Sequence, residues 1–323
     1  MLHISFEKLE KSKFRLYEKN PVVNRFGLST VVADPSVLTP EQSHDKKWHM
    51  FCHTLMGVYR YESEDGIAWQ RAGKVLGRAM RPDINYIEGV YYLYYERLQP
   101  LPERGLSLIG GKWFSEIYVV TSKDLVTWSK PKKVIGANRD YMRFGDSYSV
   151  SNPFLMRENG KNRLYFSAGL TYIKDCGFSE PTYISYAESG SLTDGFVPLG
   201  EPILKPDENS KYLNICCGCI KVYRLKDCYI GLQNGIYKDG EGNSHSAIML
   251  LKSDDGKSFE FVKPLVEPQI CPECEGRKDW MAQYVYACCL CYSEGRLYLY
   301  FNARDKAHAL KGREHIGVAI AEL

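Results

Sequence analysis

A short motif recurs along the chain and constrains its fold more than any other feature of the sequence. In each copy a β-rich segment ends in serine, an acidic or glycine-containing turn follows, and an aromatic residue then leads into a second β-rich segment. The serines are Ser63, Ser122, Ser189 and Ser253, at intervals of 59, 67 and 64 residues. Regular spacing of this size predicts a chain built from repeated small β-sheets.

A fifth copy of the motif is split between the two ends of the chain. Residues 316–323 match the segment before the turn, and residues 14–23 match the segment after it. A circular array of sheets explains this division, because the N-terminal strand then completes the last sheet and leaves no open edge. We therefore predict an all-β fold, a five-bladed β-propeller in which residues 1–323 form one domain and the N-terminal strand closes the ring.

Each repeat also contains an earlier β-rich segment, which we expect to be the innermost strand of its blade. These segments are rich in β-branched or aromatic residues and are bounded by Gly, Asn or Asp. Innermost strands converge on the axis of a propeller, so their exposed ends are expected to supply the functional site. The candidates are residues 30–38, 79–86, 147–156, 215–222 and 281–289.

The composition is that of an ordinary globular protein, with 44% hydrophobic residues, 25% charged residues and a net charge of +3. This charge is too small to predict a nucleic-acid partner, and no run of about 18 apolar residues indicates a membrane span. Residues 1–17 have no apolar core of the kind found in signal peptides. Because the 11 cysteines are odd in number, we expect a reducing, cytoplasmic location rather than a disulfide framework.

Two segments resemble those of the five-bladed propeller glycosidases, and of glycoside hydrolase family 43 in particular. Residues 33–37 read Ala-Asp-Pro-Ser-Val, and residues 81–84 read Arg-Pro-Asp-Ile ahead of the aromatic run 88–95. The resemblance implies a glycosidase that hydrolyses an O-glycosyl bond of a small carbohydrate in the central funnel. It places Asp34 at the position of the general base, and Asp83 at that of a second-blade Asp that orients its neighbours.

Hydrolysis of a glycoside needs two carboxyl groups, one that protonates the leaving oxygen and one that activates water or attacks directly. The family's third-blade Asp is replaced by Asn152, and its fourth-blade Glu has no counterpart in residues 213–220, which contain no carboxylate. The family's fifth-blade His also has no match. The candidates for the second catalytic acid are Glu180, before Pro181 in a loop-like segment, and Asp146, at the start of the third innermost strand.

Arg81 aligns with Asp34 when the prolines that follow them are superposed, so its side chain is expected to face the funnel. A guanidinium group suits a carboxylate or a phosphate, which it binds through two parallel hydrogen bonds. If Arg143 and Arg304 join it, the ligand is expected to be an anionic sugar or glycoconjugate. The other substrate-binding candidates are Asn152 and Gln283 for hydroxyl groups and Tyr284 for stacking on a sugar face.

The cysteines are clustered, but their spacing does not predict a metal site. Residues 271–274 form a single C-x-x-C pair, whereas a structural zinc site usually takes two such pairs. Residues 216–219 and 288–291 fall on predicted innermost strands, where cysteine acts as a small buried apolar residue. We therefore expect no metal and no other cofactor.

Two other functions remain open from the sequence. A protein that binds carbohydrate without cleaving it agrees with the replacement of two family acids. A glycoside phosphorylase would hold phosphate with its arginines in place of water, although the Glu-Asp-Pro-Arg motif of the related phosphorylases is not found. Two carboxyl groups facing each other across the funnel would separate a hydrolase from a binding protein.

Overall fold

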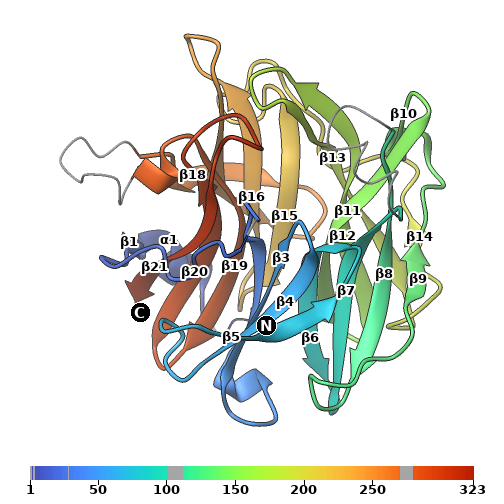
Figure 1. The fold of residues 1–323 in the computed structure, drawn as a ribbon, viewed down its shortest axis with the longest axis vertical. Helices are drawn as coiled ribbons and strands as arrows, with labels where there is room; N and C mark the ends of the chain where they lie inside the picture. Colours follow the sequence, from blue (N-terminus) through green and yellow to red (C-terminus); the bar gives the residue numbers. More distant parts are fainter. Residues whose placement is uncertain (1, 3, 28, 101–111, 270–278) are drawn as a thin grey trace.

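The computed structural model describes the chain except for residues 1, 3, 28, 101–111 and 270–278. Strands make up most of the described chain, with one short helix and a few 3₁₀ turns (Figure 1). The prediction of an all-β fold class is therefore confirmed.

The strands pair into antiparallel units, each made of four strands in succession. The first unit is β2 (Ala33–Leu38), β3 (Trp48–Thr54), β4 (Gly57–Ser63) and β5 (Gln70–Leu76). The second is β6 (Ala79–Ile87), β7 (Val90–Leu98), β8 (Phe114–Ser122) and β9 (Lys132–Ile135). The third is β11 (Ser147–Glu158), β12 (Lys161–Ile173), β13 (Phe178–Ser189) and β14 (Val197–Pro198), and the short β10 (Arg143–Phe144) also pairs with β11.

The remaining strands form two further units of the same kind. The fourth is β15 (Cys216–Arg224), β16 (Tyr229–Lys238), β17 (Ser244–Ser253) and β18 (Glu260–Val266). The last is β19 (Tyr284–Ser293), β20 (Arg296–Arg304), β21 (Glu314–Glu322) and the N-terminal β1 (Arg15–Leu16). The last unit is thus assembled from both ends of the chain, and Arg15 lies opposite Ile320 in its register.

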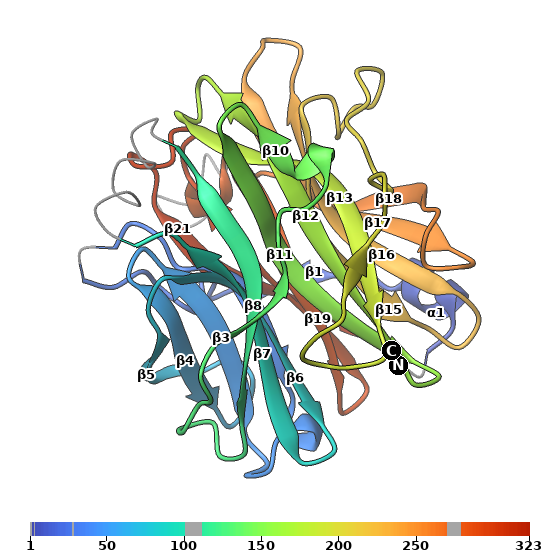
Figure 2. The ribbon, with the colours of Figure 1, turned by 90° about the vertical axis from the view of Figure 1, so that its right-hand side faces the viewer.

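Neighbouring units are joined by short parallel pairings. Strand β8 pairs with β11, which merges the second and third units into one sheet of nine strands (Figure 2). Strand β17 pairs with β19, which merges the fourth and last units into a sheet of eight, while β2 to β5 form a sheet of their own. The units are therefore consecutive in space as well as in sequence.

The predicted innermost strands are present as β2, β6, β11, β15 and β19, the first strand of each unit. Each contacts the next one in chain order, and β19 contacts β2. Hydrophobic cores fill the spaces between units. In one of them Met50 and Cys52 of β3 pack with Tyr300 of β20 and Val318 of β21, so the first unit lies against the last. This arrangement brings one end of every innermost strand into a common region.

The recurring serine and aspartate close the turn that follows the third strand of a unit. The Ser63 hydroxyl donates to Asp65 Oδ1 over 2.9 Å and accepts from the Gly66 amide over 3.0 Å. The same bonds recur around Ser122 and Ser253. Side chains that bond to backbone two or three residues away stabilise turns, which explains why this part of the motif repeats.

The short helix α1 (Phe6–Lys11) was not among the sequence expectations. Its first turn is capped by Ser5, whose side chain accepts from the Lys8 amide, and its buried face carries Leu9 into a core that includes Val285 of β19. No helix in the described part of the chain has the length and apolar character needed to cross a membrane.

Candidate active site

Every innermost strand carries a β-bulge, and at each bulge one residue has a positive φ. These residues are Asp34, Arg81, Asn152, Gly218 and Ala287, with φ of 54°, 51°, 48°, 64° and 37°. All of them line one cavity of about 100 Å³. Bulges re-aim side chains, and strained backbone of this kind gathers at functional sites. Arg81 and Asp34, which align in sequence through the prolines that follow them, therefore occupy equivalent positions in their strands.

Asp34 is buried at the bulge of β2. Its Oδ2 lies 3.2 Å from Nδ1 of His53, and its backbone amide donates to Asn302 Oδ1 over 3.0 Å. Burial raises the pKa of the Asp34 carboxyl, while the charges of Arg81 and Lys221 oppose this rise. Burial also lowers the pKa of His53 to about 3, so this imidazole is neutral at physiological pH.

Glu180 also lines the cavity, from the beginning of β13, where it lies opposite Thr171 of β12. Its side chain is buried among the innermost strands. This burial raises the pKa of Glu180 to about 7, against the opposing charges of Arg81 and Arg304. A carboxyl group that keeps its proton near neutral pH is suited to act as a general acid.

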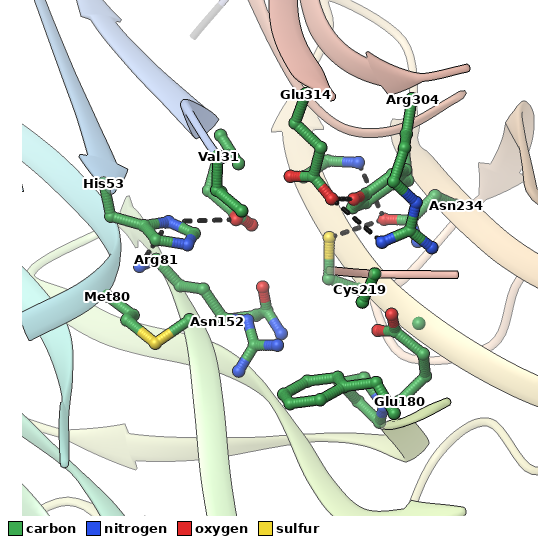
Figure 3. Close-up of a pocket in the computed structure, with 18 of the residues that line it drawn as sticks. Val31, His53, Met80, Arg81, Asn152, Glu180, Cys219, Asn234, Arg304 and Glu314 are labelled. Atoms are coloured by element: carbon green, nitrogen blue, oxygen red, sulfur yellow. Dashed lines mark hydrogen bonds and ion pairs between the residues drawn. The ribbon is translucent and has the colours of Figure 1, made fainter. Parts of the chain in front are cut away.

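Two arginines, Arg81 and Arg304, line the same cavity (Figure 3). Each is paired with a buried glutamate. Arg81 Nη1 donates to Glu96 Oε2 over 2.5 Å, and Glu96 is fully buried. Arg304 Nη1 donates to Glu314 Oε1 over 3.1 Å, and the Tyr286 hydroxyl donates to the same oxygen. Each guanidinium charge is therefore largely balanced by its own carboxylate.

The ion pairs single out two of the carboxyl groups. Within the described part of the chain, neither Asp34 nor Glu180 forms an ion pair with an arginine or a lysine. Lys221, which does not line the cavity, instead donates to the backbone oxygen of Pro153 over 3.3 Å. The cavity thus holds two carboxyl groups that are free to take part in proton transfer.

The bulge of β15 explains why the equivalent position of the fourth unit carries no acid. A Cβ atom on Gly218 would lie 2.0 Å from the backbone oxygen of Asn234, and φ at Gly218 is +64°. No side chain fits at this position, since both the close contact and the left-handed backbone favour glycine. A second acid therefore has to reach the cavity from another strand, as Glu180 does from β13.

Two predicted site residues lie away from the cavity. Asp146 is exposed over 79% of its side chain and forms an ion pair with Lys112 over 2.9 Å. Arg143 is exposed as well, and its Nη2 donates to the backbone oxygen of Ala137 over 3.0 Å. Neither lines the cavity. Arg143 is the first residue of the short β10, and Asp146 lies between β10 and β11, ahead of the inward part of β11.

Three further candidates do not line the cavity. Asp83 accepts hydrogen bonds from the Leu155 amide and from Asn85, and it borders a second cavity of about 700 Å³. Gln283 donates to the backbone oxygen of Ser244 over 2.6 Å. Tyr284 packs against the guanidinium of Arg304, 4.5 Å from the ring centre. They contact the site or its neighbours, whereas Asn152 and Arg304 line the cavity.

Sequence reasoning missed His53, Glu96 and Glu314 as members of the site. His53 and Glu96 lie on second strands, opposite Ala33 and Met80 of the innermost strands. Glu314 lies on the third strand of the last unit, opposite Arg304. Their place beside the cavity follows from the register of paired strands. The sequence contains one weak signal for them, which is a polar residue near the end of an otherwise apolar or aromatic strand.

The cysteines play no visible part in the chemistry of the cavity. Cys219 lines it, but burial raises the pKa of this thiol to about 12, so it stays protonated. In the described ranges no group of three or more His, Cys, Asp or Glu side chains is placed to hold a metal ion. The C-x-x-C pair of residues 271–274 lies outside the described residues.

No family model and no curated protein matches this chain. Solved structures do match over almost its whole length. An α-L-arabinofuranosidase from Podospora anserina is 11% identical, with 97% of this chain and 98% of that chain covered and a TM-score of 0.65. A protein of glycoside hydrolase family 130, a family of mannoside phosphorylases that also contains β-1,2-mannoside hydrolases, is 15% identical, with 96% and 93% covered and a TM-score of 0.63. A thermostable family-43 glycoside hydrolase is 12% identical, with 94% and 92% covered and a TM-score of 0.61.

At these low identities the matches show a shared fold. The resemblance to the propeller glycosidases, including family 43, is therefore confirmed at the level of the fold. Function has to be argued from the site itself.

Proposed function

We propose that this protein is a glycoside hydrolase-like enzyme that cleaves an O-glycosyl bond of a small sugar in the cavity. The observation that carries the proposal is the pair of carboxyl groups, Asp34 and Glu180, that line one cavity without a salt-bridge partner among the described arginines and lysines. Glu180 is the general acid that protonates the leaving oxygen. Asp34, held beside His53 and near the charges of Arg81 and Lys221, is the carboxylate that activates water or attacks the sugar.

The proposal includes the architecture that was expected from the sequence. We infer that the four-stranded units are the blades of a single five-bladed propeller, whose ring is closed where β1 joins β21. The contacts of each innermost strand with the next, and of β19 with β2, support this arrangement. The packing of β3 against β20 and β21 supports it as well.

The charges of the cavity favour an uncharged sugar. An anionic ligand was expected if Arg81, Arg143 and Arg304 met in the funnel. Arg81 and Arg304 do line the cavity, but each is paired with a buried glutamate, and Arg143 lies elsewhere. A negatively charged sugar would meet Asp34 and Glu180 with no surplus of positive charge, and burial of unbalanced charge is costly.

Substitution of the two carboxyl groups tests the proposal on a panel of 4-nitrophenyl glycosides. We expect Asp34→Asn and Glu180→Gln each to lower kcat by about 10²- to 10⁴-fold, the usual contribution of a positioned acid or base. Glu180→Gln should regain activity on glycosyl fluorides, because fluoride leaves without a proton. Asp34→Asn should not regain it.

Asp146→Asn is the matched control, since Asp146 is exposed and outside the cavity. It should retain full activity. If the wild type cleaves a glycoside and Asp34→Asn leaves that rate unchanged, the assignment of Asp34 is wrong.

Two specific observations keep the alternatives open to the same assay. A protein that binds sugar without cleaving it fits the replacement of two family acids by Asn152 and the Gly218 strand. A phosphorylase fits the likeness to the family-130 structure. Cleavage that requires inorganic phosphate would establish the phosphorylase, and tight sugar binding without any cleavage would establish the binding protein.

A further inference from the structure

The wall of the cavity beside Glu180 is aromatic. Phe178 and Glu180 are two residues apart on β13, so their side chains leave the strand on the same face, and both line the cavity. Phe178 is the first residue of the strand. Its ring meets that of Trp113 edge to face, with 5.7 Å between the ring centres and an interplanar angle of 85°. An aromatic pair therefore lies next to the proposed acid.

Trp113 presents only its apolar ring surface to the cavity. Its indole N–H donates to Ser115 Oγ over 2.9 Å, so this polar group is already satisfied inside the protein. Leu98 and Pro181 also line the cavity with apolar side chains. The bulges supply part of the polar lining, since Asp34, Arg81 and Asn152 offer groups that suit sugar hydroxyls.

The chemistry of glycoside cleavage indicates which part of the substrate lies beside the proposed acid. A general acid protonates the oxygen between the sugar and its leaving group, so the leaving group lies on the side of the acid. A pyranose ring has an apolar C–H face and an aryl group has a flat apolar face, and both pack well on aromatic side chains. Since the acid is flanked by Phe178 and Trp113, the leaving group meets them first.

We propose that Phe178, held in place by Trp113, forms the leaving-group subsite, and that the natural leaving group has a flat apolar face, such as a second sugar ring or an aryl group. This inference rests on the proposed function, because it takes Glu180 as the acid. It goes further by naming the residues that select the leaving group and the chemical class that they accept.

The test compares three substrates of the one sugar that the wild type cleaves in the glycoside panel. They are the glycosyl fluoride, which has no leaving-group ring, the 4-nitrophenyl glycoside, and the disaccharide of that sugar. We expect Phe178→Ala to lower kcat/KM roughly three- to tenfold for the ring-bearing substrates, mainly through KM, and to leave the fluoride nearly unchanged. Phe178→Tyr keeps the ring and should restore the wild-type values.

Tyr172→Ala is the matched control. Tyr172 lies on the neighbouring strand β12, opposite Ser179, and is 63% exposed outside the cavity. This variant should change none of the three values. A loss for only one ring-bearing substrate would identify the kind of leaving group, aryl or glycosyl, that the wall accepts.

Two other outcomes would overturn the subsite. An equal loss on all three substrates would mean that Phe178 supports the fold or the sugar-binding side rather than the leaving group. Unchanged kinetics in Phe178→Ala would mean that the ring does not contact the leaving group. A wild type that cleaves no glycoside of the panel would instead refute the proposed function, and the subsite with it.

Discussion

Glu180, the proposed general acid, is buried in a place that disfavours its charged form. The cost of this burial to the stability of the fold depends on pH. Its pKa is about 7 in the folded protein, against 4.5 as the ordinary value. Between these values the folded state binds more protons than the unfolded state, so the free energy of unfolding falls as the pH rises. Above pH 7 the full cost is present, about 3 kcal/mol for a shift of this size.

We therefore expect Glu180→Gln to be more stable than the wild type at pH 8, by up to about 3 kcal/mol, and close to it at pH 4.5. Urea unfolding at the two pH values measures this difference. Glu260→Gln, at an exposed position on β18, serves as the control and should show no such pH dependence. An equal gain at both pH values would show that the amide packs better, and would argue against a buried ionisable group.

At the scale of the element, the β-bulges of the innermost strands decide which side chains reach the cavity. Gly218 tests this directly, because a Cβ there would lie 2.0 Å from the Asn234 backbone oxygen. We expect Gly218→Ala to lower the free energy of unfolding by about 3 kcal/mol or more, the sum of left-handed backbone strain and a steric clash. Chemical denaturation provides the measurement.

Gly160 is the matched control that isolates the strain of a left-handed backbone from the steric clash. It has φ of +75° in the turn between β11 and β12, and a Cβ there would contact nothing within 4 Å. Gly160→Ala should cost about 1–2 kcal/mol, the strain of a left-handed alanine. If the two variants are equally stable, the clash with Asn234 is relieved by local movement, and the bulge tolerates a side chain.

At the scale of the whole molecule, the pairing of β1 with β21 is expected to hold the ring of units together. Deletion of residues 1–17 removes both α1 and β1, whereas deletion of residues 1–13 removes α1 and keeps β1. We expect amide hydrogen exchange in β19 to β21, and also in β2 to β5, to be faster in the longer deletion than in the shorter one. The reason is that the first unit packs against β20 and β21.

Hydrogen exchange measured by mass spectrometry on both deletions distinguishes a closed ring from a linear array. In a linear array only the last unit would lose protection, and the exchange of β2 to β5 would match in the two variants. That result would contradict the proposed closure of the ring.

The sequence by itself determined the repeated units, the first strand of each unit and the place of Asp34 on one of these strands. The turns built around Ser63, Ser122 and Ser253 are local structures, in which a side chain bonds to backbone a few residues away. Such short-range signals survive in a single sequence, as does the alternation of residues in a strand. The helix α1 escaped notice because it is only six residues long.

The tertiary structure decided which groups share the cavity and in what charge state. Arg81 was expected to face a ligand, yet its partner is Glu96, 15 residues away on the next strand. Glu180 and Asp146 were both candidates for the second acid in sequence, but only Glu180 lines the cavity with Asp34. These outcomes depend on strand register and on contacts between strands that are far apart in the chain, and no local sequence pattern contains that information. They also depend on burial, which raises the pKa of Glu180 to about 7.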